Sequence, residues 1–228
     1  LGELPANINE AISKACQEVA DGKFDTEFVV DAIQGGAGTS TNMNANEVIA
    51  NRAIEHLGGT KGDYDLVHPL NDVNKSQSTN DVYPTALKLA LILEINELLK
   101  AMAHLQGAFQ GKADEFKDVI KMGRTQLQDA VPMTLGQEFA TFSRMTMEDI
   151  QRLQETIPLL REINLGGTAI GTGLNAPAGY AQKACSILSK LSGFDFMVAE
   201  DMVEATQDAG VFVMVSGVLK RIAVKLSK

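Results

Sequence analysis

Apolar residues recur at helical spacing over several long stretches of the chain. The longest predicted helix covers Pro84 to Phe116. Its apolar side chains step by four and three positions, as in a coiled-coil seam: Leu91, Ile95, Leu98, Met102, Leu105 and Phe109. Further apolar residues lie off this seam, so the first half of the helix is apolar on most of its faces. It therefore needs cover on several sides.

Four more helices are predicted from the same spacing and from residues typical of helix ends. Thr41 is a good N-cap for the second of them, and Gly58 with Gly59 ends it. The predicted helices cover Pro5–Val19, Asn42–Leu57, Met133–Ile157 and a segment that begins near Glu200 and reaches Ile222. Strand signals are weak, because no sustained alternation with turn dipeptides occurs. The expected fold class is mainly α.

The long helices predict a bundle that this chain does not close alone. A helix of roughly 33 residues is about 50 Å long, which exceeds the diameter of a small domain. We expect the remaining apolar faces of the helices to be buried by a further C-terminal part, by other subunits, or by both. Val211 to Lys228 is a helical pattern without a stop signal, and the first residue is Leu1. We therefore expect the chain to be an internal fragment of a longer protein.

Composition excludes several classes of function. The 228 residues are 45% hydrophobic and 21% charged, which is typical of globular proteins. The 20 basic and 29 acidic residues give a net charge of −9 without any basic run, which argues against a nucleic-acid partner. The apolar stretch from Ala209 to Leu219 is too short to span a membrane. Cys16 and Cys185 form neither a disulfide framework nor a metal site, and we expect buried free thiols in a cytosolic, cytoplasmic protein.

Three segments rich in hydroxyl and amide side chains each stand directly before a predicted helix. They are Gly35–Asn42, Asn74–Asp81 and Lys121–Asp129. Hydroxyl groups and free backbone N–H groups at a helix N-terminus can bind an anion, although one such segment alone is more often only a cap. Three of them predict a pocket for a small anion, held by neutral donors. No nucleotide-binding motif, metal-ligand spacing of histidines, catalytic triad or paired carboxylates accompanies it, so no base is evident.

The same segments carry a resemblance to a known family. Gln34–Glu47, His68–Tyr83 and Lys121–Glu138 closely resemble the aspartate ammonia-lyase (aspartase) branch of the aspartase/fumarase superfamily, and Gly166–Asn175 resembles the stretch that follows. The likeness extends over essentially the whole chain. It implies a truncated long-helix bundle of the aspartase/fumarase type with a small N-terminal helical segment. Residues 1–80 would belong to the N-terminal lyase domain and residues 81–228 to the first part of the central bundle.

The resemblance also implies an activity and an assembly. Members reversibly eliminate ammonia from L-aspartate to give fumarate, without an organic cofactor or a metal in the site. They are homotetramers whose active sites combine segments of three subunits. Abstraction of the Cβ proton gives an enediolate-like carboxylate, and one preorganised hydrogen-bond donor to such charge contributes roughly 3–4 kcal/mol.

Individual roles follow from the resemblance by position. The positions that bind the carboxylates and the amino group of the substrate correspond here to Thr39, Ser78, Thr79 and Asn80. A further position that binds a carboxylate corresponds to Thr125. Gln126 also matches a substrate-binding position, which is His in the fumarase branch and in some aspartases. Gln at this position is an aspartase variant, which favours aspartase. The family's base serine would lie beyond Lys228, so the chain holds no catalytic residue and is expected to be inactive by itself. The stretch HPLNDVN departs from the usual order of the fumarase branch, which puts a second anion site near His68 and Asn71 in doubt.

Two other interpretations remain open at this point. One is fumarate hydratase or another lyase of the superfamily. The other is a non-catalytic helical oligomerisation module, which would leave the three anion-site segments unexplained.

Overall fold

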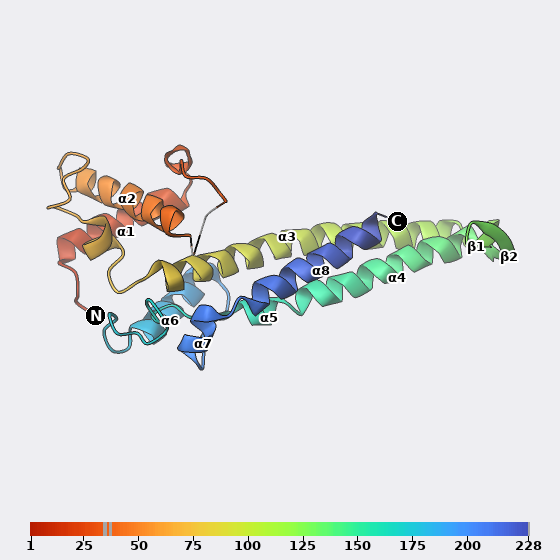
Figure 1. The fold of residues 1–228 in the computed structure, drawn as a ribbon. Coiled ribbons are helices and arrows are strands. Elements are labelled where there is room, and N and C mark those ends of the chain that lie inside the picture. Colours follow the sequence, from red (N-terminus) through yellow and green to blue (C-terminus); the bar gives the residue numbers. More distant parts are fainter. Residues whose placement is uncertain (34–35, 37, 228) are drawn as a thin grey trace. The chain divides into compact units, whose positions relative to one another are not determined.

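The computed structural model describes all residues except 34, 35, 37 and 228. The chain divides into two compact units: unit 1, Leu1–Lys88 with Glu162–Asp208, and unit 2, Leu89–Arg161 with Ala209–Lys228. The α-helices are α1 Ala6–Ala20, α2 Thr39–His56, α3 Thr79–Glu115, α4 Leu135–Gln154, α5 Ile157–Leu160, α6 Tyr180–Ser192, α7 Met202–Gln207 and α8 Gly210–Leu226 (Figure 1). The strands are β1 Ile120–Thr125, β2 Gln128–Thr134, β3 Glu162–Ile163 and β4 Met197–Val198. The mainly helical fold class is confirmed.

Unit 1 is built around the packing of α1 against α2. Small side chains at the contact let the two helices approach closely, and the core contains Ala11, Ala15, Ala50, Ala53, Ile54 and Val67. The C-terminus of α2 follows the prediction from its glycines. Gly58 has φ 81°, Gly59 N–H donates to the Ile54 carbonyl at 3.0 Å, and Gly58 N–H donates to the Glu55 carbonyl at 3.0 Å. This is a Schellman motif, which satisfies the last carbonyls of the helix.

The start of α3 differs from the prediction by five residues. The helix begins at Thr79, so Pro84 lies inside it rather than at its first position. The reason is a local cap. The Ser78 hydroxyl accepts the Asn80 N–H at 3.2 Å, and the Asp81 carboxylate accepts the Ser78 N–H at 2.9 Å. This reciprocal pair satisfies donors that the first turn leaves without partners. Residues 79–88 of α3 belong to unit 1 and the remainder to unit 2.

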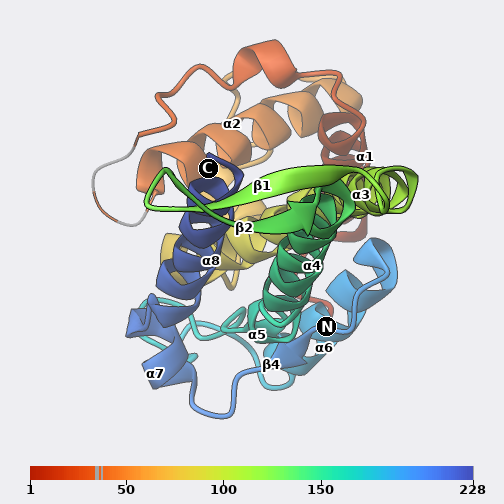
Figure 2. The ribbon, with the colours of Figure 1, turned by 90° about the vertical axis from the view of Figure 1, so that its right-hand side faces the viewer.

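Unit 2 consists of helices that run side by side, with the β1–β2 hairpin joining α3 to α4 (Figures 1 and 2). Four phenylalanines from α3, its C-terminal end and α4 pack together with ring centroids 5.6–6.4 Å apart: Phe109, Phe116, Phe139 and Phe142. The Ser143 hydroxyl on α4 links to Gln106 and Gln110 on α3 at 2.9 and 3.2 Å. These contacts bury one side of each helix.

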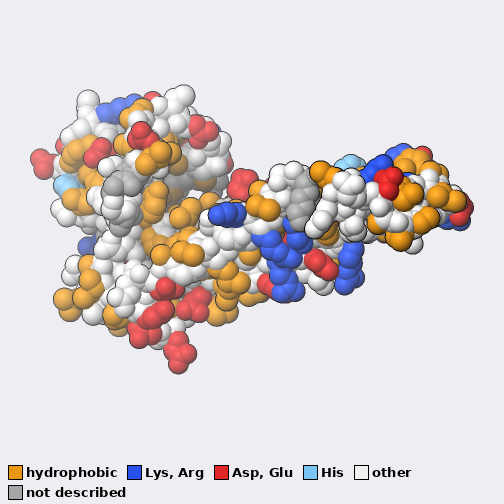
Figure 3. Space-filling model, turned by 45° about the vertical axis from the view of Figure 1, so that its right-hand side comes forward, with side chains coloured by type: hydrophobic (Ala, Val, Ile, Leu, Met, Phe, Trp, Pro, Cys, Tyr) orange, Lys and Arg blue, Asp and Glu red, His pale blue; other side chains and the backbone are white. Residues whose placement is uncertain are grey.

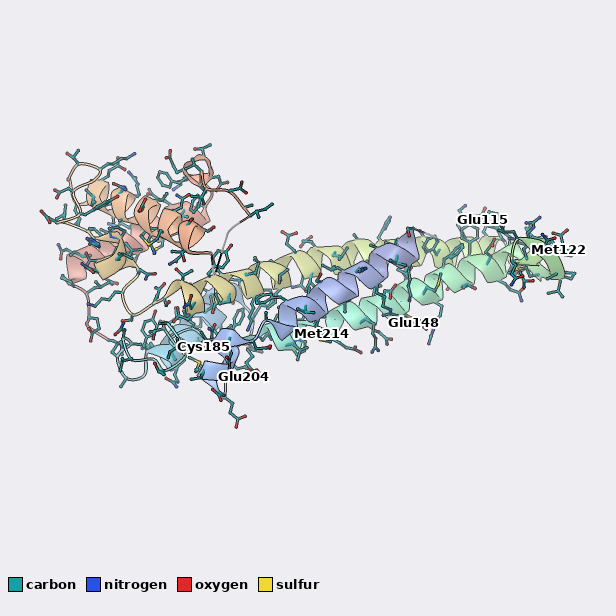
Figure 4. All side chains as sticks on the ribbon, in the orientation of Figure 1. Glu115, Met122, Glu148, Cys185, Glu204 and Met214 are labelled. Atoms are coloured by element: carbon teal, nitrogen blue, oxygen red, sulfur yellow. The ribbon has the colours of Figure 1, made fainter. Side chains whose placement is uncertain are left out.

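The β1–β2 hairpin corrects the prediction for the third polar segment. Lys121–Asp129 does not end in a helix N-terminus, because it forms two antiparallel strands with a two-residue turn. Gln126 and Leu127 in the turn have φ of 49° and 64°. Helix α4 begins only at Leu135, where Thr134 and Gln137 form a capping box. Figure 4 shows Met122 on this hairpin and Glu115 at the end of α3.

Three smaller differences concern the second half of the chain and the thiols. Helix α6 was not predicted, and the helix expected from near Glu200 is two helices, α7 and α8, separated at Asp208 and Ala209. Cys185 on α6 is buried as expected, whereas Cys16 is exposed, so the prediction of a buried thiol is wrong there. The predicted division into an N-terminal lyase domain, residues 1–80, and a central bundle, residues 81–228, stays a prediction. The two compact units are defined by contacts within this chain and do not test that boundary.

Candidate anion-binding site

The first two polar segments meet inside unit 1 through amide side chains of α2. Asn42 Nδ2 donates to the Thr79 hydroxyl at 2.9 Å and to Asn74 Oδ1 at 3.3 Å. Asn46, one helical turn further along α2, also donates to Asn74 Oδ1, at 3.1 Å. Asn42 and Asn46 are both buried. The sequence interpretation did not single out these asparagines, although their spacing of four residues on a predicted helix was a usable signal.

The N-terminus of α2 is left open by its capping residue. Gly38 is the N-cap, with φ 87°, and it makes no side-chain hydrogen bond to the first turn. A Cβ atom at Gly38 would lie 2.6 Å from the Tyr83 ring, so only glycine permits this approach to α3. Thr39 is the first residue of α2 and is exposed. Gln34, Gly35 and Ala37 of the stretch Gln34–Glu47 lie outside the described residues.

Two hydroxyl groups at the start of α3 are held as acceptors. The Ser78 hydroxyl accepts the Asn80 N–H, and the Thr79 hydroxyl accepts from Asn42. A hydroxyl has one donor hydrogen and two acceptor lone pairs, so each of these groups keeps its O–H hydrogen for another acceptor. Both residues are only half-buried. Two hydroxyls that are adjacent in the sequence therefore each keep an O–H hydrogen that can be donated to a ligand such as a carboxylate.

Asn80 connects this pair to the fourth segment of the resemblance, Gly166–Asn175. Its side-chain Nδ2 donates to the Ala169 carbonyl at 2.7 Å. Its own carbonyl accepts from Asn164 Nδ2 at 3.0 Å. Pro84 explains the second contact, because proline lacks the N–H that would otherwise reach the carbonyl four residues earlier in a helix.

Asp81 is the buried acid at the centre of this arrangement. Its side chain has 0% exposure, and its second oxygen accepts the N–H groups of Gly166 at 3.0 Å and Thr168 at 2.9 Å. Burial raises the pKa of Asp81 above its ordinary value, while the backbone N–H groups that donate to the carboxylate oppose this shift. The acid is thus enclosed by N–H donors.

Thr125 and Gln126 belong to unit 2, whereas the other four predicted residues belong to unit 1. Thr125 is the last residue of β1, and Gln126 is the first residue of the turn. Both are exposed. Leu127, which follows them, is 93% exposed, and Figure 3 shows hydrophobic side chains at the surface of the hairpin end of unit 2.

The structure thus brings Ser78, Thr79 and Asn80 together with partners from α2 and the Gly166–Asn175 stretch. A cleft of about 750 Å³ in unit 1 lies instead between the N-terminal residues, residues 72–77 and α6, and none of the six predicted residues lines it. Among the described residues, no group of His, Cys, Asp and Glu side chains is arranged to hold a metal ion. No helix in the described part of the chain is long and apolar enough to cross a membrane.

Comparison with known sequences finds a family and close relatives. The model of a family described as lyase matches residues 1–228. Aspartate ammonia-lyase of Pseudomonas aeruginosa is 58% identical over 229 residues, which are 100% of this chain and 48% of that protein. The aspartate ammonia-lyases of Helicobacter pylori and Escherichia coli are 54% and 52% identical, again over 100% of this chain. The chain therefore spans about half the length of the curated relatives it matches.

The fold of this chain is also similar to the folds of solved structures. A fumarate lyase:delta crystallin from Brucella melitensis bound to cobalt has a TM-score of 0.95 and 57% identity, covering 98% of this chain and 49% of that one. A class II fumarase from Schistosoma mansoni has a TM-score of 0.92 at 36% identity, covering 98% and 50%. The expected aspartase/fumarase type of fold is confirmed.

Proposed function

Because the chain belongs to the lyase family whose model matches all of its residues, we propose that it carries part of an aspartate ammonia-lyase. The reaction is the reversible elimination of ammonia from L-aspartate to give fumarate. Relatives named for this activity are 52–58% identical over the whole chain, and this similarity supports the choice. The substrate is a small dicarboxylate.

The pair of hydroxyl groups on Ser78 and Thr79 is the observation that carries the proposal. Both accept hydrogen bonds from this chain and keep an O–H hydrogen to donate. In the proposed site, Thr39, Ser78, Thr79 and Asn80 bind the carboxylates and the amino group of the substrate. Thr125 and Gln126 are proposed to bind the same substrate from another subunit, Thr125 as a further donor to a carboxylate.

Such donors act on the charge that develops during the reaction. Removal of the Cβ proton places negative charge on the neighbouring carboxylate, and fixed neutral donors stabilise that charge more than they stabilise the substrate. The base that takes the proton is proposed to lie in a segment outside this chain. Gln126 cannot serve, because an amide does not take up a proton near neutral pH.

Fumarate hydration is the second candidate function, because the class II fumarase of Schistosoma mansoni shares the fold with a TM-score of 0.92. Its identity of 36% is lower than the 52–58% of the ammonia-lyases. The presence of Gln126 rather than His at the fumarase position also favours ammonia-lyase. A purely structural oligomerisation module leaves the hydroxyl pair without a role.

The assembly proposed is a homotetramer in which three subunits contribute to each site. Exposed apolar side chains along the helices of unit 2 support it, among them Leu93 at 50% and Val213 at 70% exposure. Leaving such side chains in water is unfavourable by roughly 1.5–3 kcal/mol for each one that could be fully buried. The proposed location is cytoplasmic, in line with the free thiols of Cys16 and Cys185.

An assay of the full-length protein tests the function directly. The protein is supplied with L-aspartate, and fumarate is followed by its ultraviolet absorbance, with ammonia measured in the same samples. We expect both products in equal amounts. Conversion of fumarate to malate together with no fumarate from L-aspartate would make the protein a fumarase and contradict the proposal.

A further inference from the structure

The two oxygens of Asp81 have different partners. Oδ1 accepts the N–H of Ser78, three residues earlier, and this contact completes the local cap of α3. Oδ2 accepts the N–H groups of Gly166 and Thr168, which lie 85 and 87 residues away in the sequence. A capping role explains only the first oxygen. The second oxygen joins the start of α3 to a distant loop.

That loop is held in a conformation that its sequence disfavours. Thr168 has φ 57°, in the left-handed region, and β-branched residues rarely adopt it. The residue is buried, with 4% exposure, and its N–H is one of the two groups that Asp81 holds. Such backbone strain persists only where surrounding contacts maintain it. The carboxylate of Asp81 is one of those contacts.

The next residue of the loop touches the proposed site. The carbonyl of Ala169 accepts the side-chain N–H of Asn80 at 2.7 Å. Asp81 therefore fixes the surroundings of Asn80 from two directions. It fixes the backbone of the Ser78–Asn80 segment through Oδ1, and it fixes the partner of the Asn80 side chain through Oδ2.

We infer that Asp81 is a positioning residue, whose buried carboxylate sets the donors of Ser78, Thr79 and Asn80 at the distance and direction that a dicarboxylate substrate requires. This inference rests on the proposed function. Asp81 itself has 0% exposure and three backbone donors, so it does not touch the substrate. Its effect on the reaction passes through the segment that it holds.

The test is the substitution D81N in the full-length protein. The side chain keeps its size, but one of its two acceptor oxygens becomes an NH₂ group, which cannot accept an N–H. At least one backbone donor then loses its partner, and the segment it holds is released. The matched control is D149N. Asp149 is an acid with 3% exposure in unit 2, ion-paired to Arg221 and Lys225, and it is not a predicted site residue.

Both variants are expected to lower the denaturation midpoint, but only D81N is expected to weaken substrate binding. We expect KM for L-aspartate, and the inhibition constant of succinate, to rise about tenfold or more in D81N, which corresponds to about 1.4 kcal/mol. In D149N both constants should stay within about twofold of the parent, which corresponds to about 0.4 kcal/mol. Circular dichroism and sedimentation establish that each variant is folded and assembled.

Each result has a definite meaning. A folded D81N with the parent's KM and succinate constant would overturn the inference and leave Asp81 as a structural residue. If D81N does not fold, D81E, which keeps the charge but displaces it by one methylene group, must show the rise in KM. If D81E also fails to fold while D149N folds, Asp81 is needed for folding as a whole, and the inference is overturned. An inactive parent would contradict the proposed function instead.

Discussion

Asn164 and Pro84 act on the same backbone carbonyl, and a double-mutant cycle can measure their coupling. Pro84 lies inside α3 and has no N–H, so the Asn80 carbonyl lacks its helical donor. Asn164 Nδ2 donates to that carbonyl at 3.0 Å. We expect Asn164→Ala to destabilise the parent more than it destabilises a protein that carries Pro84→Ala.

The contacts give the magnitude. Asn164 has 0% exposure, and Asn164→Ala removes its hydrogen bonds to the Asn80 carbonyl and to the Thr206 hydroxyl at 3.1 Å. Each such bond contributes about 0.5–1.5 kcal/mol, and a carbonyl left without a donor costs about 1–3 kcal/mol more. In the Pro84→Ala background, a backbone N–H reaches the carbonyl, so this second cost disappears. The expected coupling free energy is therefore about 1 kcal/mol or more.

A separate contribution cancels in the cycle. Among the described residues, Asn164 Oδ1 is a buried oxygen with no hydrogen-bond partner. Its removal relieves the same cost in both backgrounds, so it changes each single variant but not the coupling. The cycle therefore isolates the carbonyl that Asn164 and Pro84 share.

The assay is urea denaturation of the full-length protein and its variants. All samples need the same protein concentration, because the stability of an oligomer depends on it. Pro158→Ala is the matched control, since Pro158 lies in α5 of unit 2. Its combination with Asn164→Ala should be additive. If Pro84→Ala and Asn164→Ala are also additive, within about 0.3–0.5 kcal/mol, then Asn164 does not replace the missing helical donor.

Three further predictions concern other parts of the chain. Thr125→Ala in the full-length protein should lower kcat/KM at least about tenfold, or about 1.4 kcal/mol, by removing a donor to a substrate carboxylate; steady-state kinetics equal to the parent would refute its role. The hydrogen bonds from the Arg52 guanidinium hold the pKa of Glu18 at about 2, so Glu18→Gln should lower the denaturation midpoint at pH 7. This difference in midpoint should persist above the ordinary pKa of a carboxyl group, shrink as the pH falls towards 2, and vanish below pH 2. A difference that does not depend on pH would show that the charge of Glu18 does not contribute to stability. A Cβ at Gly136 would lie 2.5 Å from a backbone carbonyl oxygen of α3, so Gly136→Ala should cost about 1–3 kcal/mol in urea denaturation, whereas Gly107→Ala, in open space, should not destabilise.

The sequence alone predicted the C-terminal ends of the helices that carry regular apolar spacing and clear end signals. The start of α2 was predicted wrongly, because the helix begins at Thr39 and its N-cap is Gly38 rather than Thr41. Helix α2 ends at His56, one residue before the predicted Leu57, because Gly58 and Gly59 can adopt the Schellman conformation without strain. Helix α3 likewise ends at Glu115, one residue before the predicted Phe116. These features depend on residues close together in the chain, so a sequence pattern can reveal them. The three polar segments could be recognised for the same reason, because the residues of each one are adjacent in the chain.

The β1–β2 hairpin could not be predicted from local signals. Its turn places Gln126 and Leu127 at positive φ, where Asn and Gly are the usual residues. Neither strand alternates regularly between buried and exposed positions. The hairpin is nevertheless formed, with the ends of α3 and α4 held together by their aromatic side chains. Packing between distant residues overrides the local preference here.

The candidate site depends on such distant contacts even more strongly. The sequence indicated Ser78, Thr79 and Asn80. No local pattern showed that the Asp81 carboxylate would accept the N–H groups of Gly166 and Thr168. Nor did any local pattern show that Asn164 would donate a hydrogen bond to the Asn80 carbonyl. Those partners are 84–87 residues apart in the chain. Buried carboxylates and carbonyls must find hydrogen-bond donors, but only the folded chain decides which donors are within reach.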